Sequence, residues 1–367
     1  MIEILNTPKI SSFDLWDDFC NEFQLNENDL IITNKFFITG HLVNKFGCHV
    51  VFQEEYGTGE PSDTMIDSIF EDIKGFNYHR VIGIGGGTIL DIAKLFAINL
   101  KSPVSDLFQG KVIPEKRKAL ILIPTTCGTG SEVTNISIIK LNSLHTKLGL
   151  SDKSLFADDA VLIPELLKDL PQYVFATSSI DAFIHSVESF LSPKASGISE
   201  IFSEKAITEI LQGYIELNKN NDTGVYKKFL SASCYAGIAF GTAGCGAVHA
   251  LSYPIGANYA VPHGEANYSV FLSVMRKYQE LNPNGKIIRL KTLISQILKC
   301  HLYNAFNETE KLLNKQLEHK KLNCYGIKKE ELYDFSDSVL KNQARLLNNN
   351  YTNLSRQDIL EIYQSAY

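Results

Sequence analysis

The sequence lacks long hydrophobic runs and any large excess of charge of one sign. No apolar stretch in its 367 residues approaches the ~18 that a membrane-spanning helix requires. Lysine and arginine total 35 against 41 aspartates and glutamates, which gives a formal charge of −6, and no basic block occurs. A mildly acidic chain without such a block is a poor candidate for binding nucleic acid or an anionic membrane. We therefore expect neither of these partners.

Cysteine pairing motifs are also absent. The seven cysteines are an odd number, are scattered along the chain and include no C-x-x-C pair. This pattern excludes a zinc ribbon and a disulfide framework. The N-terminal residues are acidic and lack both the basic and the apolar region of a signal peptide. Together these features predict a reduced protein of the cytoplasm.

The composition is that of a globular protein, with 44% hydrophobic and 21% charged residues, and the length predicts two domains. In the first half, short apolar runs alternate with segments whose apolar residues recur at helical spacing. We expect strands at 30–33, 49–52, 80–84 and 120–124, and helices at 62–73 and after residue 87. This alternation predicts an α/β domain with a doubly wound parallel sheet over residues 1–168.

The pattern changes near residue 164. From residue 171 onward, apolar residues recur mostly at three- and four-residue spacing, which predicts an all-α C-terminal domain over residues 169–367. Within it, residues 178–191 are predicted to form a helix. The stretch 304–329 is rich in lysine, glutamate and asparagine, which predicts a solvated helical face.

Two glycine-rich turns each follow a predicted strand. The first, residues 85–91, contains Gly86, Gly87, Thr88 and Asp91, and glycines there let a phosphate approach the N-terminus of a helix. It matches neither the G-x-G-x-x-G fingerprint nor a Walker A loop, so an unliganded tight turn is the alternative. The second, residues 124–132, combines hydroxyls with glycines. Two such turns at one edge of a sheet favour a dinucleotide.

Three histidines and one aspartate stand out in the second half. Asp181 and His185 are four residues apart in a predicted helix and so share a face, and His249 and His263 follow later. Three imidazoles and a carboxylate suit a divalent transition metal such as Fe²⁺ or Zn²⁺. By spacing alone, any one of these histidines could instead be a satisfied core residue, and Asp181 could cap a turn.

In combination, the motifs resemble those of the iron-containing (group III) alcohol dehydrogenase family. The matches are residues 85–94, residues 124–132, Asp181-x-x-x-His185, and His249 followed after fourteen residues by His263 within Pro262-His263-Gly264. They occur in the family's order and span most of the chain. Within the family, residues 59–63, 126–135 and 249–256 are similar to the clostridial-type 4-hydroxybutyrate dehydrogenase subgroup.

The resemblance implies a dehydroquinate synthase-like architecture, with the cofactor on the first domain, the metal on the second and the site in the cleft between them. It implies that Asp181, His185, His249 and His263 ligate Fe²⁺, with Zn²⁺ as the alternative. These four residues and Tyr253 are the expected catalytic set. The positions implied to line the nicotinamide cofactor are Asn34, Gly86, Gly87, Thr88, Asp91, Thr125, Thr126, Thr134 and Lys147.

Two of these positions depart from the family. Asn34 stands where the family often has an aspartate that repels a 2′-phosphate, so NAD is expected without excluding NADP. Tyr253 stands four residues after His249, where many relatives have a second histidine implicated in proton relay. A phenol with a pKa of ~10 is a poorer shuttle at neutral pH. The relay is therefore expected to use water, the ribose hydroxyls or a perturbed Tyr253.

The implied activity is reversible NAD(P)-linked interconversion of 4-hydroxybutyrate and succinate semialdehyde, with the metal as a Lewis acid on the substrate oxygen and hydride transfer at the nicotinamide. Another short-chain substrate (butanol, a diol or a phosphonate-linked aldehyde), a glycerol dehydrogenase-like enzyme and a non-catalytic relative stay open. A homodimer is implied by the resemblance. Candidates for binding the substrate carboxylate are Tyr253, Asn135, Asn258, Tyr268 and Lys140. Glu265 is hypothesised to orient a metal-binding histidine.

Overall fold

A computed structural model describes residues 3–4, 8–38, 47–142, 146–220 and 223–367. The chain divides into two compact units, Asn6–Leu170 and Pro171–Tyr367, the second together with Met1–Leu5. We call them the α/β unit and the helical unit. The domain boundary predicted between residues 168 and 169 stays a prediction.

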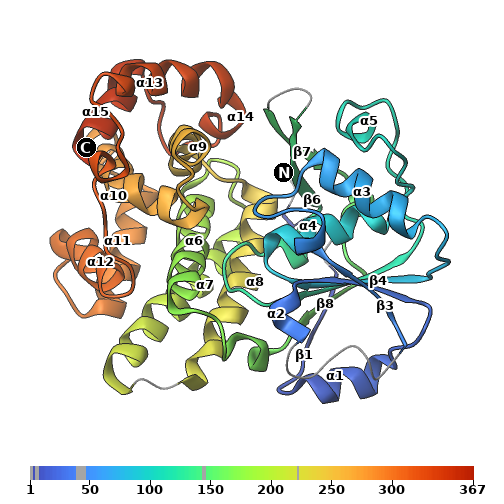
Figure 1. The fold of residues 1–367 in the computed structure, drawn as a ribbon. Helices are drawn as coiled ribbons and strands as arrows, with labels where there is room; N and C mark the ends of the chain where they lie inside the picture. The colour runs from blue at the N-terminus through green and yellow to red at the C-terminus, as the bar shows by residue number, and fades with distance from the viewer. Residues whose placement is uncertain (1–2, 5–7, 39–46, 143–145, 221–222) are drawn as a thin grey trace. The chain divides into compact units, whose positions relative to one another are not determined.

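A six-stranded sheet forms the centre of the α/β unit, and all of its strand pairs are parallel (Figure 1). In spatial order the strands are β1 (Lys9–Ser12), β8 (Asp159–Leu162), β5 (Ala119–Pro124), β4 (Arg80–Gly85), β2 (Asp29–Thr33) and β3 (His49–Phe52). The four predicted strands are confirmed as β2, β3, β4 and β5. Strands β1 and β8 were not predicted. For β1 the reason is that it is mostly exposed and carries only one large apolar residue, Ile10.

Helices cover both faces of this sheet, which confirms the predicted doubly wound class. On one face, α3 (Asp63–Ile73) and α4 (Gly87–Phe96) contribute to a buried cluster with Val81 and Leu122 of the strands. On the other face, α1 (Trp16–Phe23) contributes Phe19 to a second cluster with Ile82. Because both faces are covered, the central strands are apolar throughout instead of alternating.

The remaining elements of the α/β unit are short. They are α2 (Lys35–Ile38), η1 (Gln53–Glu55), α5 (Ser105–Phe108), η2 (Ser131–Val133), η4 (Lys153–Leu155) and η5 (Pro164–Leu167). An antiparallel hairpin of β6 (Ile136–Leu141) and β7 (Thr146–Ser151), also not predicted, follows η2. It carries the chain from the second glycine-rich turn back toward the sheet.

The described residues of the helical unit contain no strand, as predicted for an all-α domain. Its elements are α6 (Gln172–Leu191), α7 (Gly197–Asn220), η6 (Thr223–Val225), α8 (Tyr226–Ala243), α9 (Ala247–Tyr259), α10 (His263–Leu281), α11 (Lys286–Leu298), η7 (Leu302–Asn304), α12 (Ala305–Asn314), η8 (Leu322–Tyr325), α13 (Glu331–Asn342), α14 (Ala344–Leu347) and α15 (Arg356–Ala366). Helix α6 packs against α7, α8 and α10 and is buried along most of its length (Figure 1).

Two predictions for this unit need correction. Helix α6 begins at Gln172, six residues before the predicted start at 178. The stretch 304–329 is not one solvated helical face. It is broken into α12 and η8, and it buries Phe306, Leu313 and Leu322. The lysines, glutamates and asparagines of this stretch obscured the apolar residues that pack inward.

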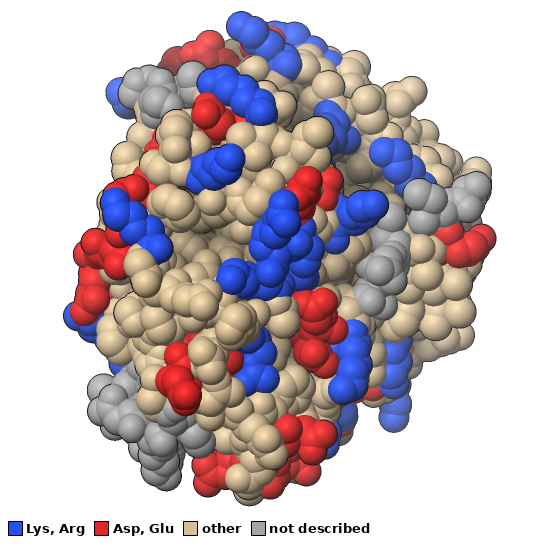
Figure 2. Space-filling view, turned by 90° about the vertical axis from the view of Figure 1, so that its right-hand side faces the viewer, with Lys and Arg blue, Asp and Glu red and all other residues tan. Residues whose placement is uncertain are grey.

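Charges are mixed on the surface. On the face drawn in Figure 2, lysine and arginine side chains lie among acidic ones, and the densest basic group is bordered by acidic side chains. Exposed ion pairs of this kind each stabilise a protein little. Among the described helices, none alone is long and apolar enough to cross a bilayer, although the bent pair α8 and α9 passes that test when both are counted together.

Candidate functional site

The four predicted metal ligands meet in the helical unit. Helix α6 presents Asp181 and His185 one turn apart, α9 carries His249 in its first turn, and α10 begins at His263. Their four ligand atoms all lie within 4.8 Å of one another. Asp181 Oδ1 is 3.8 Å from Nε2 of both His249 and His263, and Nε2 of His185 is 2.9 Å from Nε2 of His249.

A glycine lets the two long helices approach closely enough to form this cluster. Gly264 follows His263 at the start of α10, and a Cβ atom there would lie 2.1 Å from the carbonyl oxygen of Thr177 on α6. No side chain fits in that space. The close approach brings His263 to Asp181, one turn further along α6.

Three of the four side chains in the cluster are buried, and the fourth is accessible. Asp181, His185 and His249 are buried, whereas the His263 side chain is 43% exposed. Burial favours a raised pKa for Asp181, but the three histidines and a hydrogen bond from Asn267 hold its pKa below the ordinary value. Asp181 is therefore an anion near neutral pH, as a ligand for a cation has to be.

Asn267 is a residue of the cluster that the sequence analysis missed. Its Nδ2 lies 2.7 Å from Asp181 Oδ1 and 3.2 Å from Nε2 of both His249 and His263. Its Oδ1 is buried and has no hydrogen-bond partner among the described residues. The four-residue spacing from His263 to Asn267 on one helix was the signal that could have found it.

Glu188 is the second residue that was missed. Its Oε2 lies 2.5 Å from Nδ1 of His249, and its Oε1 accepts a 2.6 Å hydrogen bond from the backbone N–H of Val248. Burial lowers the pKa of His249, but Cys245 and Glu188 outweigh it and hold that pKa well above the ordinary value. The sequence did contain a signal for Glu188. It follows Asp181 and His185 at the i, i+4, i+7 spacing of one helix face.

The hypothesis that Glu265 orients a histidine is wrong. Its carboxylate accepts hydrogen bonds from the hydroxyls of Tyr173 and Tyr325 and from Lys320 Nζ. Glu265 lies two residues after His263 on α10, and residues two apart do not face each other on a helix. The hypothesis relied on the nearness of Glu265 to His263 in sequence, and it therefore assigned Glu265 to the wrong side of the helix.

Tyr253 lies beside the cluster. It follows His249 by one turn of α9, is half-buried, and its ring centroid is 6.5 Å from that of His263. Burial raises the pKa of the Tyr253 phenol, while His249 and Arg345 act in the opposite direction. A phenol with a raised pKa keeps its proton at neutral pH and can donate a hydrogen bond.

The predicted cofactor residues lie in the α/β unit, several of them at the carboxyl ends of adjacent strands. Gly86 precedes α4 after β4, Thr125 and Thr126 follow β5, and Asn34 follows β2. Thr125 Oγ1 is buried and has no partner among the described residues. A Cβ atom on Gly87 would lie 2.7 Å from Thr129 Cγ2, so only glycine allows the two turns to pack this closely.

Asp91 and Thr134, also predicted to line the cofactor, belong to a cluster around a buried lysine. Lys94 is completely buried, and its Nζ lies 3.4 Å from Asp91 Oδ1, 2.6 Å from Ser131 Oγ, 3.2 Å from Thr134 Oγ1 and 2.6 Å from the carbonyl oxygen of Ile136. Burial lowers the Lys94 pKa, while Asp91 opposes that effect. The cluster fixes the second glycine-rich turn to α4.

Glu132 lies in the same turn as Ser131. Its carboxylate is buried, and neither oxygen has a hydrogen-bond partner among the described residues. Burial raises the pKa of Glu132 to about 7, against the opposing charge of Lys94. The sequence analysis assigned no role to either Glu132 or Lys94.

The other predicted cofactor residues have these positions. Thr88 is half-buried in the first turn of α4. Asn34 Nδ2 donates a 3.1 Å hydrogen bond to Gln53 Oε1. Lys147 is exposed on β7 and pairs with Glu60 at 2.5 Å.

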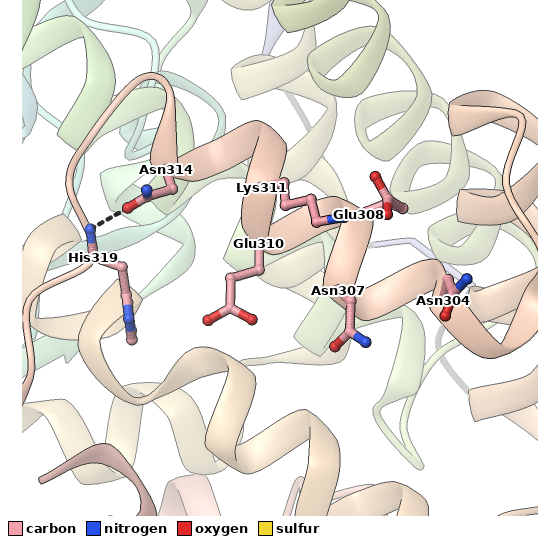
Figure 3. Close-up of a pocket in the computed structure, with 7 residues that line it drawn as sticks. All are labelled: Asn304, Asn307, Glu308, Glu310, Lys311, Asn314 and His319. Carbon is pink, nitrogen blue, oxygen red and sulfur yellow. Dashed lines mark hydrogen bonds and ion pairs between the residues drawn. The ribbon is translucent and has the colours of Figure 1, made fainter.

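A separate surface hollow lies along α12 (Figure 3). Its lining is polar and consists of Asn304, Asn307, Glu308, Glu310, Lys311, Asn314 and His319. None of the residues of the metal cluster or of the glycine-rich turns lines it. We therefore do not assign the active site to this hollow.

Comparisons with known proteins agree with this geometry. The profile described as "Iron-containing alcohol dehydrogenase" matches residues 13–164, and that described as "Fe-containing alcohol dehydrogenase family, C-terminal" matches residues 175–367. The 4-hydroxybutyrate dehydrogenase of Clostridium kluyveri is 48% identical over 365 residues, which cover 98% of this chain and 98% of that protein. Long-chain-alcohol dehydrogenase 1 of Geobacillus thermodenitrificans is 33% identical, over 79% of this chain and 75% of its own.

A solved structure shares the fold. Sulfoacetaldehyde reductase from Bifidobacterium kashiwanohense, solved in complex with NAD⁺, superposes with a TM-score of 0.83 at 21% identity. The match covers 100% of this chain and 98% of the reductase. At this level of identity the likeness concerns the fold alone.

Proposed function

Because the chain belongs to the iron-containing alcohol dehydrogenase family, we propose that it interconverts 4-hydroxybutyrate and succinate semialdehyde with a nicotinamide cofactor. The observation that carries the oxidoreductase chemistry is the convergence of Asp181, His185, His249 and His263 within 4.8 Å. The choice of substrate is supported by the 48% identity to the clostridial 4-hydroxybutyrate dehydrogenase.

The donor set fits a divalent transition metal. One carboxylate and three imidazoles are the ligands that Fe²⁺ and Zn²⁺ accept, and they would hold the ion at Asp181, His185, His249 and His263. The bound metal supplies a Lewis acid for the substrate oxygen. Glu188 holds His249 by its Nδ1 atom, which leaves Nε2 directed at the other ligands. The exposed side of His263 gives the substrate an approach.

The glycine-rich turns fit a dinucleotide. Gly86, Gly87 and Thr88 would hold the diphosphate at the N-terminus of α4, where backbone N–H groups are unpaired within the helix. The buried Thr125 hydroxyl, which has no described partner, would hydrogen-bond the cofactor. The neutral amide of Asn34 carries no charge against a 2′-phosphate, so we propose that NADH and NADPH both bind, with NADH as the usual cofactor.

Proton delivery completes the reductive direction. Tyr253 keeps its proton because burial raises its pKa, and it lies next to His263. We place it as a hydrogen-bond donor that orients the substrate, while water at the exposed side of His263 supplies the proton. Replacing Tyr253 by phenylalanine would then lower turnover less than the loss of a metal ligand.

Reduction of succinate semialdehyde by protein reconstituted anaerobically with Fe²⁺ tests the proposal, with NADH and NADPH compared in parallel. Butyraldehyde, which lacks the carboxylate, is the matched control. A strong preference for the semialdehyde supports the proposed substrate. Equal or faster turnover of butyraldehyde would overturn it and favour the alternative of an iron-dependent dehydrogenase for a short-chain alcohol.

We also propose that the enzyme works in the cytoplasm as a homodimer. None of the seven cysteines, all of which lie in the described part of the chain, forms a disulfide, which suits a reducing compartment. The dimer is supported by the family resemblance alone. Light scattering of the purified protein tests it, and a monomeric mass would exclude it.

A further inference from the structure

This inference rests on the proposed function and concerns Asn267, the residue of the metal cluster that the family resemblance did not include. Asn267 lies on α10, one helical turn after His263, and its side chain is completely buried. Its Nδ2 is 2.7 Å from Asp181 Oδ1 and 3.2 Å from Nε2 of both His249 and His263. The end of this amide therefore touches three of the four proposed ligand atoms, which come from three different helices.

This position makes the amide a neighbour of any ion that the cluster binds. Zn²⁺ and similar ions bind imidazole nitrogens and carboxylate oxygens at about 2.0–2.2 Å. An ion at that distance from Asp181 Oδ1 and from Nε2 of the two histidines lies among the same atoms that Asn267 Nδ2 touches. The end of the Asn267 side chain is then next to the ion, so its chemistry has to suit a cation.

The nitrogen end of the amide does not suit a cation. The Nδ1 atom of His249 faces the Glu188 carboxylate at 2.5 Å, so Nδ1 carries the hydrogen and Nε2 presents a lone pair. Asn267 Nδ2 donates toward that lone pair, and an ion that binds the lone pair removes this acceptor. The positive ends of the N–H groups are also repelled by the ion. A bound ion therefore disfavours this orientation of the amide.

The oxygen end of the amide can take the place of the nitrogen. Asn267 Oδ1 is buried and has no hydrogen-bond partner among the described residues. A buried polar atom without a partner is uncommon in a folded protein and calls for an explanation. The two ends of an asparagine amide have nearly the same shape, so a half turn of the amide exchanges them without moving α10. The turn breaks no described hydrogen bond of Oδ1 and brings a carbonyl oxygen to the ion.

We propose that Asn267 is a fifth ligand of the metal through Oδ1 and that it makes the centre favour Fe²⁺ over Zn²⁺. A neutral carbonyl oxygen is a donor that divalent cations accept. Zn²⁺ is satisfied by four donors in a tetrahedral arrangement, which the four proposed ligands already provide. Fe²⁺ accommodates more donors than Zn²⁺, so a fifth one stabilises the bound Fe²⁺ and still leaves a position for the substrate oxygen.

Two substitutions of Asn267 separate the roles of the two ends of its amide. Asn267→Leu keeps the size of the side chain and removes both polar ends, whereas Asn267→Asp keeps an oxygen and loses the N–H donors. Asn342→Leu, which removes an exposed amide on α13, is the matched control. The affinities of the full chain for Fe²⁺ and for Zn²⁺ are measured under anaerobic conditions by competition with a chromogenic chelator, which requires no turnover.

For Asn267→Leu, we expect the affinity for Fe²⁺ to fall about 10- to 100-fold and the affinity for Zn²⁺ to fall less than about threefold. The Zn²⁺ binding that is retained shows that the variant is folded. Asn267→Asp should bind Fe²⁺ at least as tightly as the wild type, because it still presents an oxygen. Co²⁺ absorbs visible light more strongly with four ligands than with five, so its absorption should be stronger in Asn267→Leu. Asn342→Leu should change none of these values.

Three results would overturn the assignment of Asn267. They are equal losses of Fe²⁺ and Zn²⁺ affinity in Asn267→Leu, unchanged or tighter binding of Fe²⁺ in that variant, and binding of Fe²⁺ by Asn267→Asp that is as weak as by Asn267→Leu. An unchanged Co²⁺ absorption in Asn267→Leu would exclude the loss of a ligand and overturn it as well. A wild-type protein that binds neither Fe²⁺ nor Zn²⁺ would instead overturn the metal centre of the proposed function, so the two failures are distinguishable.

Discussion

The two units each contain a buried polar cluster, and the clusters differ in where their cation comes from. In the α/β unit, the Lys94 ammonium lies among the oxygens of Asp91, Ser131, Thr134 and Ile136, so the chain itself provides the positive charge. In the helical unit, a carboxylate and three imidazoles face one another around the amide of Asn267. The first cluster has its cation within the chain, whereas we propose that the second takes an ion from solution.

On this proposal, the difference gives one cluster a structural role and the other a chemical one. A cation that belongs to the chain cannot leave, so it fixes the geometry of a turn permanently. A cation taken from solution has coordination positions that a substrate can reach. Each of the following predictions changes one of the two clusters and not the other.

The largest effect is expected from removing the charge of the helical cluster. Asp181→Asn keeps the shape but loses the anion among the three histidines, so metal binding should be lost together with turnover, a fall on the order of a thousandfold or more. Metal content after gel filtration and kcat/KM measure the two effects. Asp337→Asn, at an exposed ion pair, is the charge-matched control. Full metal content in Asp181→Asn would contradict the ligand assignment.

Removing the cation of the other cluster should lower stability instead. Lys94→Met leaves Asp91 without its buried partner, which is expected to lower the free energy of unfolding by about 3–5 kcal/mol. Urea denaturation measures this change. The double variant Lys94→Met with Asp91→Asn should recover part of the loss because residue 91 then carries no charge. Metal content of the helical unit should not change, and a change would show that the clusters are not independent.

Glu132, in the same turn, should make the stability of the folded protein depend on pH. Its folded pKa of about 7 lies above the ordinary 4.5, so between these values the folded state holds a proton that the unfolded state has lost. Its contribution to stability is therefore fully present below pH 4.5 and is lost as pH rises to about 7, by about 3 kcal/mol. Glu132→Gln should flatten this part of the stability profile. Glu71→Gln, at an exposed ion pair, should leave it unchanged.

The smallest effect is expected from changing Glu188, which contacts the proposed metal ligand His249. Glu188→Gln should weaken metal affinity about 10- to 100-fold, because the group that orients His249 then holds it less firmly. Competition with a chromogenic chelator measures the affinity. Glu265→Gln is the matched control on α10 and should leave it unchanged, because Glu265 contacts two tyrosines and a lysine instead. A larger loss in Glu265→Gln than in Glu188→Gln would contradict this view of the centre.

Contiguous features were readable from the sequence, whereas contacts across helices were not. The apolar runs of β2, β3, β4 and β5 predicted the centre of the sheet, because strands buried on both faces have an unmistakable composition. Strand β1 escaped because its exposed residues carry little such signal. Spacing alone left open whether His249 and His263 are metal ligands or core histidines, and only the family resemblance joined them to Asp181.

Glu188 and Glu265 also show that contacts between helices could not be predicted from the sequence. Glu265 attracted attention because it is near His263 in sequence, yet it lies on another side of α10. Glu188 is 61 residues from His249 and contacts it directly. Which helix faces meet is decided by close packing at positions such as Gly264, and a single sequence does not display it.

We expect the exposure of His263 to set how long a bound metal stays in the protein. An ion held by three buried ligands and one accessible ligand is expected to exchange through the accessible one, since only there can water or a chelator replace a protein donor. The protein can then acquire its ion after folding and give it up without unfolding. The working lifetime of the enzyme would follow the metal supply and the oxygen exposure of its surroundings as much as the stability of its fold.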